Sequence, residues 1–265
     1  IRAYPESKLL IRRYLGARDF MNGYKRYAIY VEDKNIELAY SIPPLLDRFE
    51  KVKKFRLSSK KSATKRKAEF PHQFDDTLIK ESNMLIVPQT VSSSRNYTVV
   101  DFFNSMILPS NALRAIYSNE PWIFSVLSSK MHILWVKSVA GRLKMDIQYS
   151  NTLCYNTFPF PEISKNKKEQ ITQHAFDIIE EREKNSEKTL AQLYTKDKMP
   201  DGLKEAHRLN DIAVEKCYRS TPFIHDEERL QYLFSLYEKM IEIENNKGTL
   251  FAEAAQKKRK RRVDA

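Results

Sequence analysis

The 265-residue sequence contains little glycine and little cysteine. The glycines are isolated from one another, so the chain has no glycine-rich turn of the kind that holds a nucleotide-like cofactor; they are Gly16, Gly23, Gly141, Gly202 and Gly248. The two cysteines, Cys154 and Cys217, lie far apart in apolar surroundings without a CxxC spacing. This pattern predicts reduced core thiols in an intracellular protein rather than a disulfide or a metal site.

Long hydrophobic runs are also missing. A membrane-spanning helix needs ~20 consecutive apolar residues, and the longest candidate, 121–140, is interrupted by Ser128, Ser129, Lys130 and Lys137. The sequence begins with Ile1 and contains no signal-like region, from which we expect a piece of a longer protein. No membrane partner is expected.

Motifs of nucleases, deaminases and metal sites are also incomplete. Glu6-Ser7-Lys8 and Glu32-Asp33-Lys34 fit the minimal Glu-x-Lys pattern of Mg²⁺-dependent nucleases. The first lacks an upstream aspartate, and the second lacks the usual proline. His225-x-Glu227 lacks the Pro-Cys-x-x-Cys of zinc deaminases, and the helical positions of His132 and His207 favour core or surface histidines. We therefore predict no catalytic residue and no metal ligand.

Positive charge is present in excess and is unevenly distributed. The chain carries 46 Lys and Arg against 34 Asp and Glu, a net charge of +12. Residues 1–160 hold 25 of these cations against 14 carboxylates, whereas the remaining residues hold 21 against 20. Because Lys and Arg release condensed counterions from phosphate backbones, this asymmetry predicts a polyanionic partner for the first part of the chain. A merely solvated basic surface is the alternative.

The densest charge lies between Arg48 and Lys67, where ten cations face Glu50 alone. A helix is predicted from Ile42 to about Phe55, with Ser41 as its cap, and a serine-rich loop follows. We interpret this segment as a loop that grips phosphates and becomes ordered only on DNA; a flexible polar loop without a partner is the alternative. The predicted phosphate contacts in this segment and near the first turn are Lys25, Arg26, Lys53, Lys54, Arg56, Lys60, Lys61, Lys65, Arg66 and Lys67.

Two β-rich segments, 83–88 and 97–103, flank the loop QTVSSSRN and are predicted as strands. Arginine binds guanine bidentately and asparagine binds adenine in the same way, so a loop carrying both could read bases in a groove. The predicted contacts are Ser93, Ser94, Arg95 and Asn96. A salt-bridged or simply exposed Arg95 is an equal alternative.

The segment 130–162 organises the rest of the chain. Ser128 and Ser129 precede a helical stripe over 130–139, Gly141 ends that helix, and extended chain leads to a Pro-Phe-Pro exit at 159–161. Arg142 and Lys144 follow the glycine and are predicted to contact DNA, although Arg142 could instead satisfy the last helical carbonyls.

The remaining elements complete an α+β prediction. Asn22-Gly23 predicts a turn before a strand at 25–31, and short helices are expected at 111–117 and 122–127. After residue 161 the apolar spacing predicts a bundle of helices at 168–184, 190–194, 203–218 and 226–246. The predicted organisation is a mixed strand and helix DNA target-recognition domain (1–161), an all-α helical domain (162–256) and a disordered basic tail (257–265).

Four blocks occur in one order along the chain. They are YLGARDFMNGYKRYAIYVED (14–33), LIVPQTVSSSRNYTVVDF (85–102), GRLKMDIQYSN with YNTFPFPE (141–162), and LAQLYTKDKMPDGLKEAHRLNDIAVEKCY (190–218). Together they resemble the C-terminal part of MmeI-type (type IIL) enzymes, comprising the target recognition domain and the helical domain after it. Those enzymes are large single-chain DNA adenine methyltransferases, often fused to a nuclease, and related methyltransferases of phage defence share the pattern.

The resemblance implies sequence-specific recognition of double-stranded DNA in the cytoplasm of a bacterium or archaeon. It also implies a methyltransferase domain in the same polypeptide, upstream of Ile1, that binds S-adenosylmethionine. This chain lacks the family's Asn-Pro-Pro-aromatic block, because its only Pro-Pro pair follows Ile42, so no catalytic residue and no cofactor is assigned to it. Two alternatives stay open: a module that binds structured RNA, and a helical protein-interaction scaffold that binds no nucleic acid.

Overall fold

A computed structural model describes residues 3–74, 80 and 82–263 of the chain, with side chains described as far as Asn246. The chain folds into two compact units. The first combines residues 1–86 with 102–118, and the second combines 87–101 with 119–265. The boundary predicted after Pro161 lies inside the second unit and stays a prediction.

The first unit contains a three-stranded sheet with the order β2-β1-β6. β1 (Ile11–Leu15) pairs antiparallel with β2 (Arg26–Ile29) and parallel with β6 (Ile107–Pro109). α1 (Ala17–Asn22) connects the first two strands and ends at Gly23, whose φ of 73° allows the chain to leave the helix. The strand expected after Asn22-Gly23 is confirmed.

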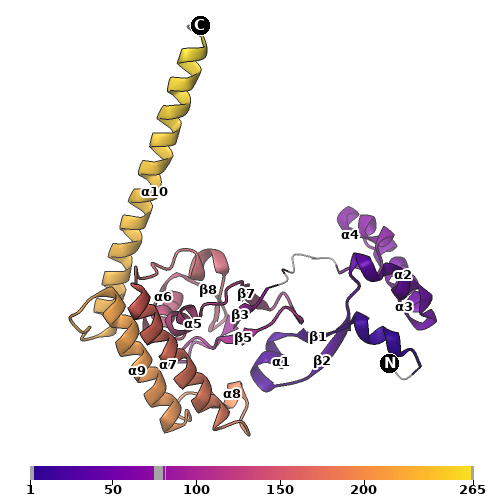
Figure 1. Ribbon diagram of the computed structural model, residues 1–265, viewed down its shortest axis with the longest axis horizontal. Helices are drawn as coiled ribbons and strands as arrows, with labels where there is room; N and C mark the ends of the chain where they lie inside the picture. Colours follow the sequence, from indigo (N-terminus) through magenta and orange to yellow (C-terminus); the bar gives the residue numbers. More distant parts are fainter. Residues whose placement is uncertain (1–2, 75–79, 81, 264–265) are drawn as a thin grey trace. The chain divides into compact units, whose positions relative to one another are not determined.

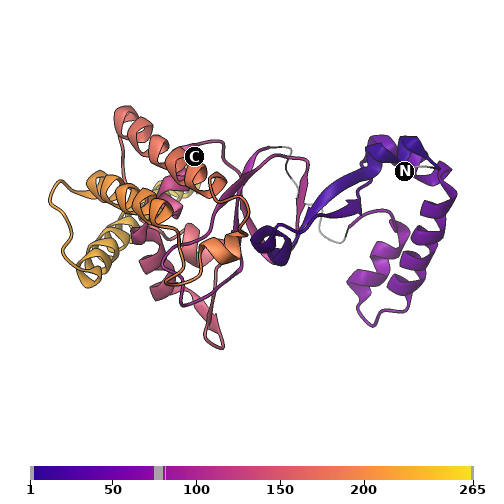
Figure 2. The ribbon, with the colours of Figure 1, turned by 90° about the horizontal axis from the view of Figure 1, so that it is seen from below.

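Short helices pack beside this sheet around a small core, and α2, α3 and α4 form one helical group (Figures 1 and 2). The core residues are Leu10, Val31, Ala39, Ile42, Leu45 and Phe49. Pro43 starts α3 without a side-chain cap, so the prediction of Ser41 as its cap is wrong. The Ser41 hydroxyl instead donates to the carbonyl of Leu38 at 2.8 Å. The elements are η1 (Pro5–Leu10), η2 (Asp33–Asn35), α2 (Ile36–Ser41), α3 (Pro43–Leu57), α4 (Ser62–Arg66) and η3 (Lys67–Glu69).

A second sheet has the order β5-β3-β7, and the chain passes between the two units within β3 and β5. β3 (Met84–Pro88) confirms the strand predicted at 83–88; it is the central strand of this sheet and is buried along its whole length. β7 (Leu113–Ile116) is a strand, so the helix predicted over 111–117 is wrong. An apolar run this short fits the side-chain spacing of a helix and that of a strand equally well. The predicted strand at 97–103 is reduced to β5 (Asp101–Phe103).

In the second unit a third sheet has the order β4-β9-β8. β8 (Gly141–Leu143) and β9 (Asp146–Gln148) form an antiparallel hairpin, and β4 (Thr90–Val91) pairs antiparallel with β9. α6 (Lys130–Val139) precedes the hairpin and is capped by Ser129, as predicted. A short π-helix at Asn151–Tyr155 replaces part of the extended chain that was expected there.

Helices make up the rest of the second unit, and α7 packs along α9 (Figure 1). Their apolar stripes bury a core that includes Trp135, Phe158, Ile171, Val214 and Leu233, which confirms the helical bundle. α10 continues to Val263 through the basic segment 257–262, where a disordered tail was predicted; the side chains of that segment lie outside the described residues. The helices are α5 (Pro121–Leu127), α7 (Lys165–Glu183), α8 (Leu190–Leu193), α9 (Asp201–Tyr218) and α10 (Asp226–Val263).

Over the described ranges, no helix has both the length and the apolar character that crossing a membrane requires.

Candidate nucleic-acid interface

The first unit carries most of the excess charge, with 20 Lys and Arg against 11 Asp and Glu. Six exposed side chains on the second half of α3, the following turn and α4 form what we term the basic helical surface: Lys53, Lys54, Lys60, Lys61, Lys65 and Arg66. None of the six pairs with a carboxylate of the residues that the structure describes. Lys51 differs, because its Nζ lies 2.6 Å from Oδ2 of Asp47. The charge of the basic helical surface is therefore available to an anionic partner.

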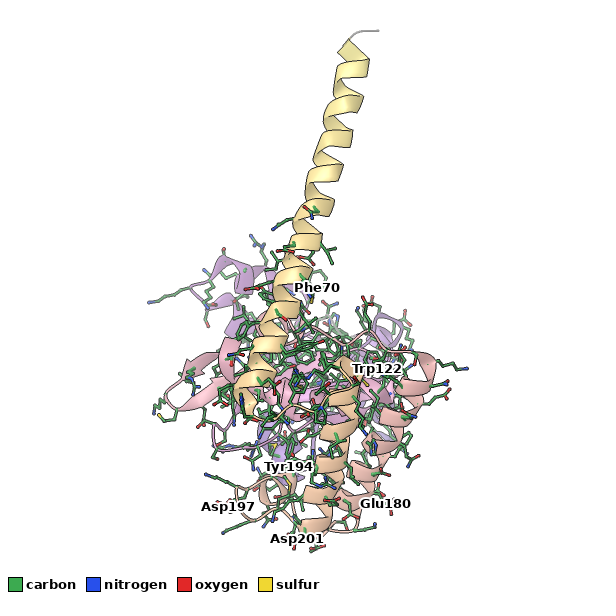
Figure 3. The ribbon with its side chains drawn as sticks, turned by 90° about the vertical axis from the view of Figure 1, so that its left-hand side faces the viewer. Phe70, Trp122, Glu180, Tyr194, Asp197 and Asp201 are labelled. Carbon is green, nitrogen blue, oxygen red and sulfur yellow. The ribbon has the colours of Figure 1, made fainter. Side chains whose placement is uncertain are left out.

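The segment that follows α3 forms α4 and η3, so the prediction of a loop there is wrong, while the dependence of its order on DNA stays a prediction. Arg56 closes it by donating from Nη1 to the carbonyls of Lys67 and Phe70, both at 2.8 Å, and from Nη2 to the carbonyl of Gln73 at 2.7 Å. Phe70 is labelled in Figure 3. Arg56 thus has a structural role that its charge alone did not reveal, and Lys67 is only half exposed. Contact of these two side chains with a nucleic acid stays a prediction.

The two cations near the first turn have different surroundings. Lys25 is exposed, whereas Arg26 binds the buried carboxylate of Asp19, with Nη2 2.5 Å from Oδ2 and Nε 2.8 Å from Oδ1. The backbone N–H of Gly16 donates to the same carboxylate at 2.6 Å. The Arg26 hydrogen bonds hold the pKa of Asp19 below its usual value. Arg26 keeps an exposed edge, but its guanidinium is held by Asp19 in the first turn of α1.

The third sheet brings together two groups that the sequence placed far apart. In its register Val91 lies opposite Ile147, and Leu143 lies opposite Asp146. The loop 92–96 after β4 therefore begins beside the tip of the β8–β9 hairpin. Arg142 and Lys144 are exposed on this hairpin, and Lys144 has a φ of 56° at its turn. The structure thus unites the predicted loop with the predicted hairpin cations, while the basic helical surface belongs to the other unit.

Within the loop, a turn exposes part of the polar sequence. The N–H of Arg95 donates to the carbonyl of Ser92 at 3.1 Å, and the hydroxyls of Ser92 and Ser94 lie 3.0 Å apart. Ser94 and Asn96 are exposed, and Ser93 is half-buried. The exposed hydroxyl and amide groups can donate to and accept from base edges or phosphates.

Arg95 is half-buried rather than fully extended at the loop tip. Burial lowers the pKa of its guanidinium, and the nearby carboxylate of Asp146 on β9 partly offsets this effect. The guanidinium remains charged because its reference pKa is so high. Asp146 thus gives Arg95 an acidic neighbour across the sheet, a relation that no local sequence pattern indicated.

A buried polar network that the sequence did not predict lies behind this loop. His207 is fully buried and neutral, because burial lowers its pKa to about 3. Its Nδ1 lies 3.2 Å from the carbonyl of Ser128 and must carry the proton, so Nε2 accepts from the hydroxyl of Tyr194 at 2.8 Å. Arg182 donates to the same hydroxyl oxygen at 2.5 Å from Nη2 and to the carbonyl of Val100 at 2.8 Å from Nη1. Figure 3 labels Tyr194, which immediately follows α8.

Asp211 on α9 extends the network toward the loop. Its Oδ2 accepts from the hydroxyl of Tyr97 at 2.9 Å, and its Oδ1 accepts from the N–H of Lys130 at 2.6 Å. Burial raises the pKa of Asp211 to about 7, although both hydrogen bonds favour the ionised form. The ring of Tyr97 stacks on His207 with centroids 4.0 Å apart. Sequence patterns gave no signal for this site because its members lie on separate segments.

These observations define a class: a mixed α and β recognition module with a cationic helical surface and a braced polar loop. In the described part of the chain, no group of three or more His, Cys, Asp or Glu side chains is placed to hold a metal ion.

Comparison with known proteins specifies the family. The target recognition domain of MmeI matches residues 1–162, and the C-terminal domain of MmeI matches residues 163–243. The chain therefore belongs to the MmeI family and comprises its target recognition and C-terminal domains, as the four sequence blocks predicted.

Two relatives illustrate the match. The chain is 38% identical over 242 residues to DNA methyltransferase A of Bacillus subtilis (strain 168). The aligned region covers 91% of this chain and 27% of that protein. It is also similar to the solved structure of the type IIL restriction-modification enzyme MmeI in complex with DNA, with a TM-score of 0.86 and 33% identity. That similarity covers 91% of this chain and 32% of the solved chain. The chain thus spans about a third or less of the length of these relatives.

Proposed function

We propose that this chain is the module that recognises a specific double-stranded DNA sequence for an N6-adenine DNA methyltransferase of the restriction-modification type. The observation that carries the proposal is the basic helical surface, six exposed cations without carboxylate partners, on a fold that MmeI uses in complex with DNA. The similarity to DNA methyltransferase A supports the methyltransferase part.

In this proposal the two units have different tasks. The basic helical surface, together with Lys25, Arg26, Arg56 and Lys67, contacts phosphates, which supply affinity but carry no sequence information directly. The loop Ser93–Asn96 and the hairpin residues Arg142 and Lys144 contact base edges, because Arg, Lys, Asn and Ser provide the donors and acceptors that discriminate bases in the major groove.

The methyl-transfer step belongs to another part of the same polypeptide in this proposal. S-adenosylmethionine does not fit this chain, whose five glycines are too far apart to form the turn that such a cofactor requires. We infer that a methyltransferase domain in the same polypeptide binds the cofactor and the target adenine, in the cytoplasm of a bacterium or archaeon.

The test is the salt dependence of DNA binding. Lys53, Lys60, Lys61 and Lys65 are replaced together by Ala, and the affinity for a short duplex is measured by fluorescence anisotropy at several KCl concentrations. Each lost phosphate contact reduces the slope of log K against log [KCl] by about 0.9, so we expect a slope smaller by up to about 3.6. The affinity should fall for every duplex sequence alike.

The control replaces four lysines that already pair with carboxylates, namely Lys51, Lys184, Lys188 and Lys204. It removes the same net charge but should leave most of the slope intact. A slope that is equal in both variants would show that total charge, not the basic helical surface, attracts DNA. Preference for a structured RNA over the duplex at matched salt would instead favour an RNA-binding module, and negligible affinity for both at low salt would favour a protein scaffold.

A further inference from the structure

The loop 92–96 is held differently at its two ends. On the N-terminal side β4 pairs with β9 through the backbone, with Thr90 opposite Gln148. On the C-terminal side residues 98–100 are buried but belong to no strand of the described structure. Backbone pairing therefore fixes one end of the loop, and side chains must fix the other.

Tyr97 supplies the first of these side-chain anchors. It directly follows Asn96, its ring lies nearly parallel to the ring of His207 at an angle of 18°, and its hydroxyl donates to Asp211. Both partners are on α9, 110 or more residues later in the chain. Asp211 is itself fixed by the N–H of Lys130 at the start of α6.

Arg182 supplies the second anchor. It is 7% exposed, and its donation to the carbonyl of Val100 fixes the chain three residues beyond Tyr97. Its position depends on Tyr194, which also bonds to His207. The two anchors thus share one hydrogen-bonded network, so loss of one member loosens the attachment of the loop.

We propose that Tyr97, His207 and Asp211 are positioning residues that set DNA sequence selectivity without touching DNA, by fixing the C-terminal end of the loop 92–96. This inference rests on the proposed function of that loop. It assigns a role in recognition to α9, a helix of the segment that matches the MmeI C-terminal domain.

The consequence concerns selectivity more than affinity. Phosphate contacts made by the basic helical surface do not depend on the anchors, so binding to unrelated sequences should persist when an anchor is lost. A loop released at one end must lose conformational freedom on binding, which weakens every contact to base edges. The expected signature is therefore a lower ratio of specific to non-specific affinity.

The first experiment measures the loop itself, in the longest natural polypeptide that contains this chain. Tyr97→Phe retains the ring stacking but removes the donor to Asp211. The control, Tyr232→Phe, removes a comparable tyrosine hydroxyl that donates to the carbonyl of Tyr218 at 3.1 Å. Hydrogen exchange at residues 92–96, including the bonded amide of Arg95, should become about tenfold faster in Tyr97→Phe only. Equal exchange in the two variants overturns the anchoring role, whether or not the protein binds DNA.

The second experiment measures selectivity at pH 8, where Asp211 is ionised. A preferred duplex is selected from a random library with the natural protein, and its affinity is compared with that of an unrelated duplex. Tyr97→Phe and Asp211→Ala should lower the ratio of the two affinities about tenfold, with unchanged salt dependence. Asp211→Asn can keep its oxygen on the N–H of Lys130 and donate from its NH2 group to the hydroxyl oxygen of Tyr97, so it should keep most of the ratio.

The outcomes separate the two claims. If the natural protein selects no sequence, the proposed function is wrong, and the exchange experiment alone decides the anchoring role. If selection succeeds but Tyr97→Phe and Asp211→Ala keep the natural ratio, the positioning role is wrong while the proposed function stands. Loss of selectivity in Tyr232→Phe as well would show a general effect of destabilisation and would also overturn the inference.

Discussion

Asp211 should make the second unit less stable as the pH rises toward 8. Its pKa is raised from 3.8 to about 7 in the folded protein, chiefly by burial. Between these values the folded state holds a proton that the unfolded state has released, so the stabilising contribution is complete below pH 3.8 and is lost as the pH rises through 7. Three charged groups interact with Asp211: Glu215 raises its pKa further, Lys130 lowers it, and Asp211 in turn raises the pKa of Arg229.

The size of this effect follows from proton linkage. One proton changes the free energy of unfolding by about 1.4 kcal/mol per pH unit while the two states differ in protonation. Integrated from pH 5 to pH 8, the shift gives at most about 2.7 kcal/mol. Because Asp211 keeps some exposure to water, which reduces the cost of its charge, we expect about 1 to 2.5 kcal/mol. Asp211→Asn cannot titrate and should lose this part of the pH dependence.

Tryptophan fluorescence is a suitable assay, because the chain's two tryptophans, Trp122 and Trp135, both lie in the second unit. The free energy of unfolding in urea is measured at pH 5 and at pH 8. The difference between the two pH values should be smaller for Asp211→Asn than for the natural chain. Glu205→Gln on the same helix is the control: Arg208 lowers the pKa of Glu205 below its ordinary value of 4.5, so the group titrates mostly below pH 5 and its replacement should leave the difference between pH 5 and pH 8 nearly unchanged. An unchanged difference in Asp211→Asn would refute the assignment of the raised pKa to Asp211.

Three further predictions test other parts of the molecule. Arg56→Met removes three bonds to carbonyls and should cost about 1.5 to 3 kcal/mol locally, seen as faster hydrogen exchange over 67–73 and not elsewhere. Trp135→Ala empties a fully buried core position and should destabilise the second unit by about 3 to 5 kcal/mol in urea unfolding followed by Trp122; a cost below 1 kcal/mol would contradict the core assignment. Arg95→Ala should relax the preference at one base pair by about 1 to 3 kcal/mol in competition binding, and a uniform loss over all sequences would identify a phosphate contact instead.

The long amphipathic helices were the most predictable part of the fold. The helix predicted over 168–184 lies within α7 except for its last residue, and 130–139 coincide with α6, because a helical period repeated over several turns fits few alternatives. The error at 111–117 has the opposite origin: its few apolar positions fit a strand as well, and pairing with β3 decides the outcome.

The candidate site was less predictable, because charge density says nothing about partners. Arg56 counted as one cation among ten, yet three of its donors are used by carbonyls that follow in the chain. The network behind the loop joins Tyr97 to Asp211 across 114 residues, and neither residue stands in a local motif. Only the folded chain brings them into contact. The DNA contacts assigned to individual side chains stay predictions.

The attachment of Tyr97 and Val100 to α7 and α9 limits how such proteins can be recombined. A chimera joined at residue 162, where the target recognition domain meets the C-terminal domain, would combine the loop of one parent with the helices of the other. Unless the incoming helices supplied an arginine, a histidine and an aspartate at equivalent places, the transplanted loop would lack its supports. Exchange of residues 87–218 as one cassette keeps donor and acceptor from the same parent.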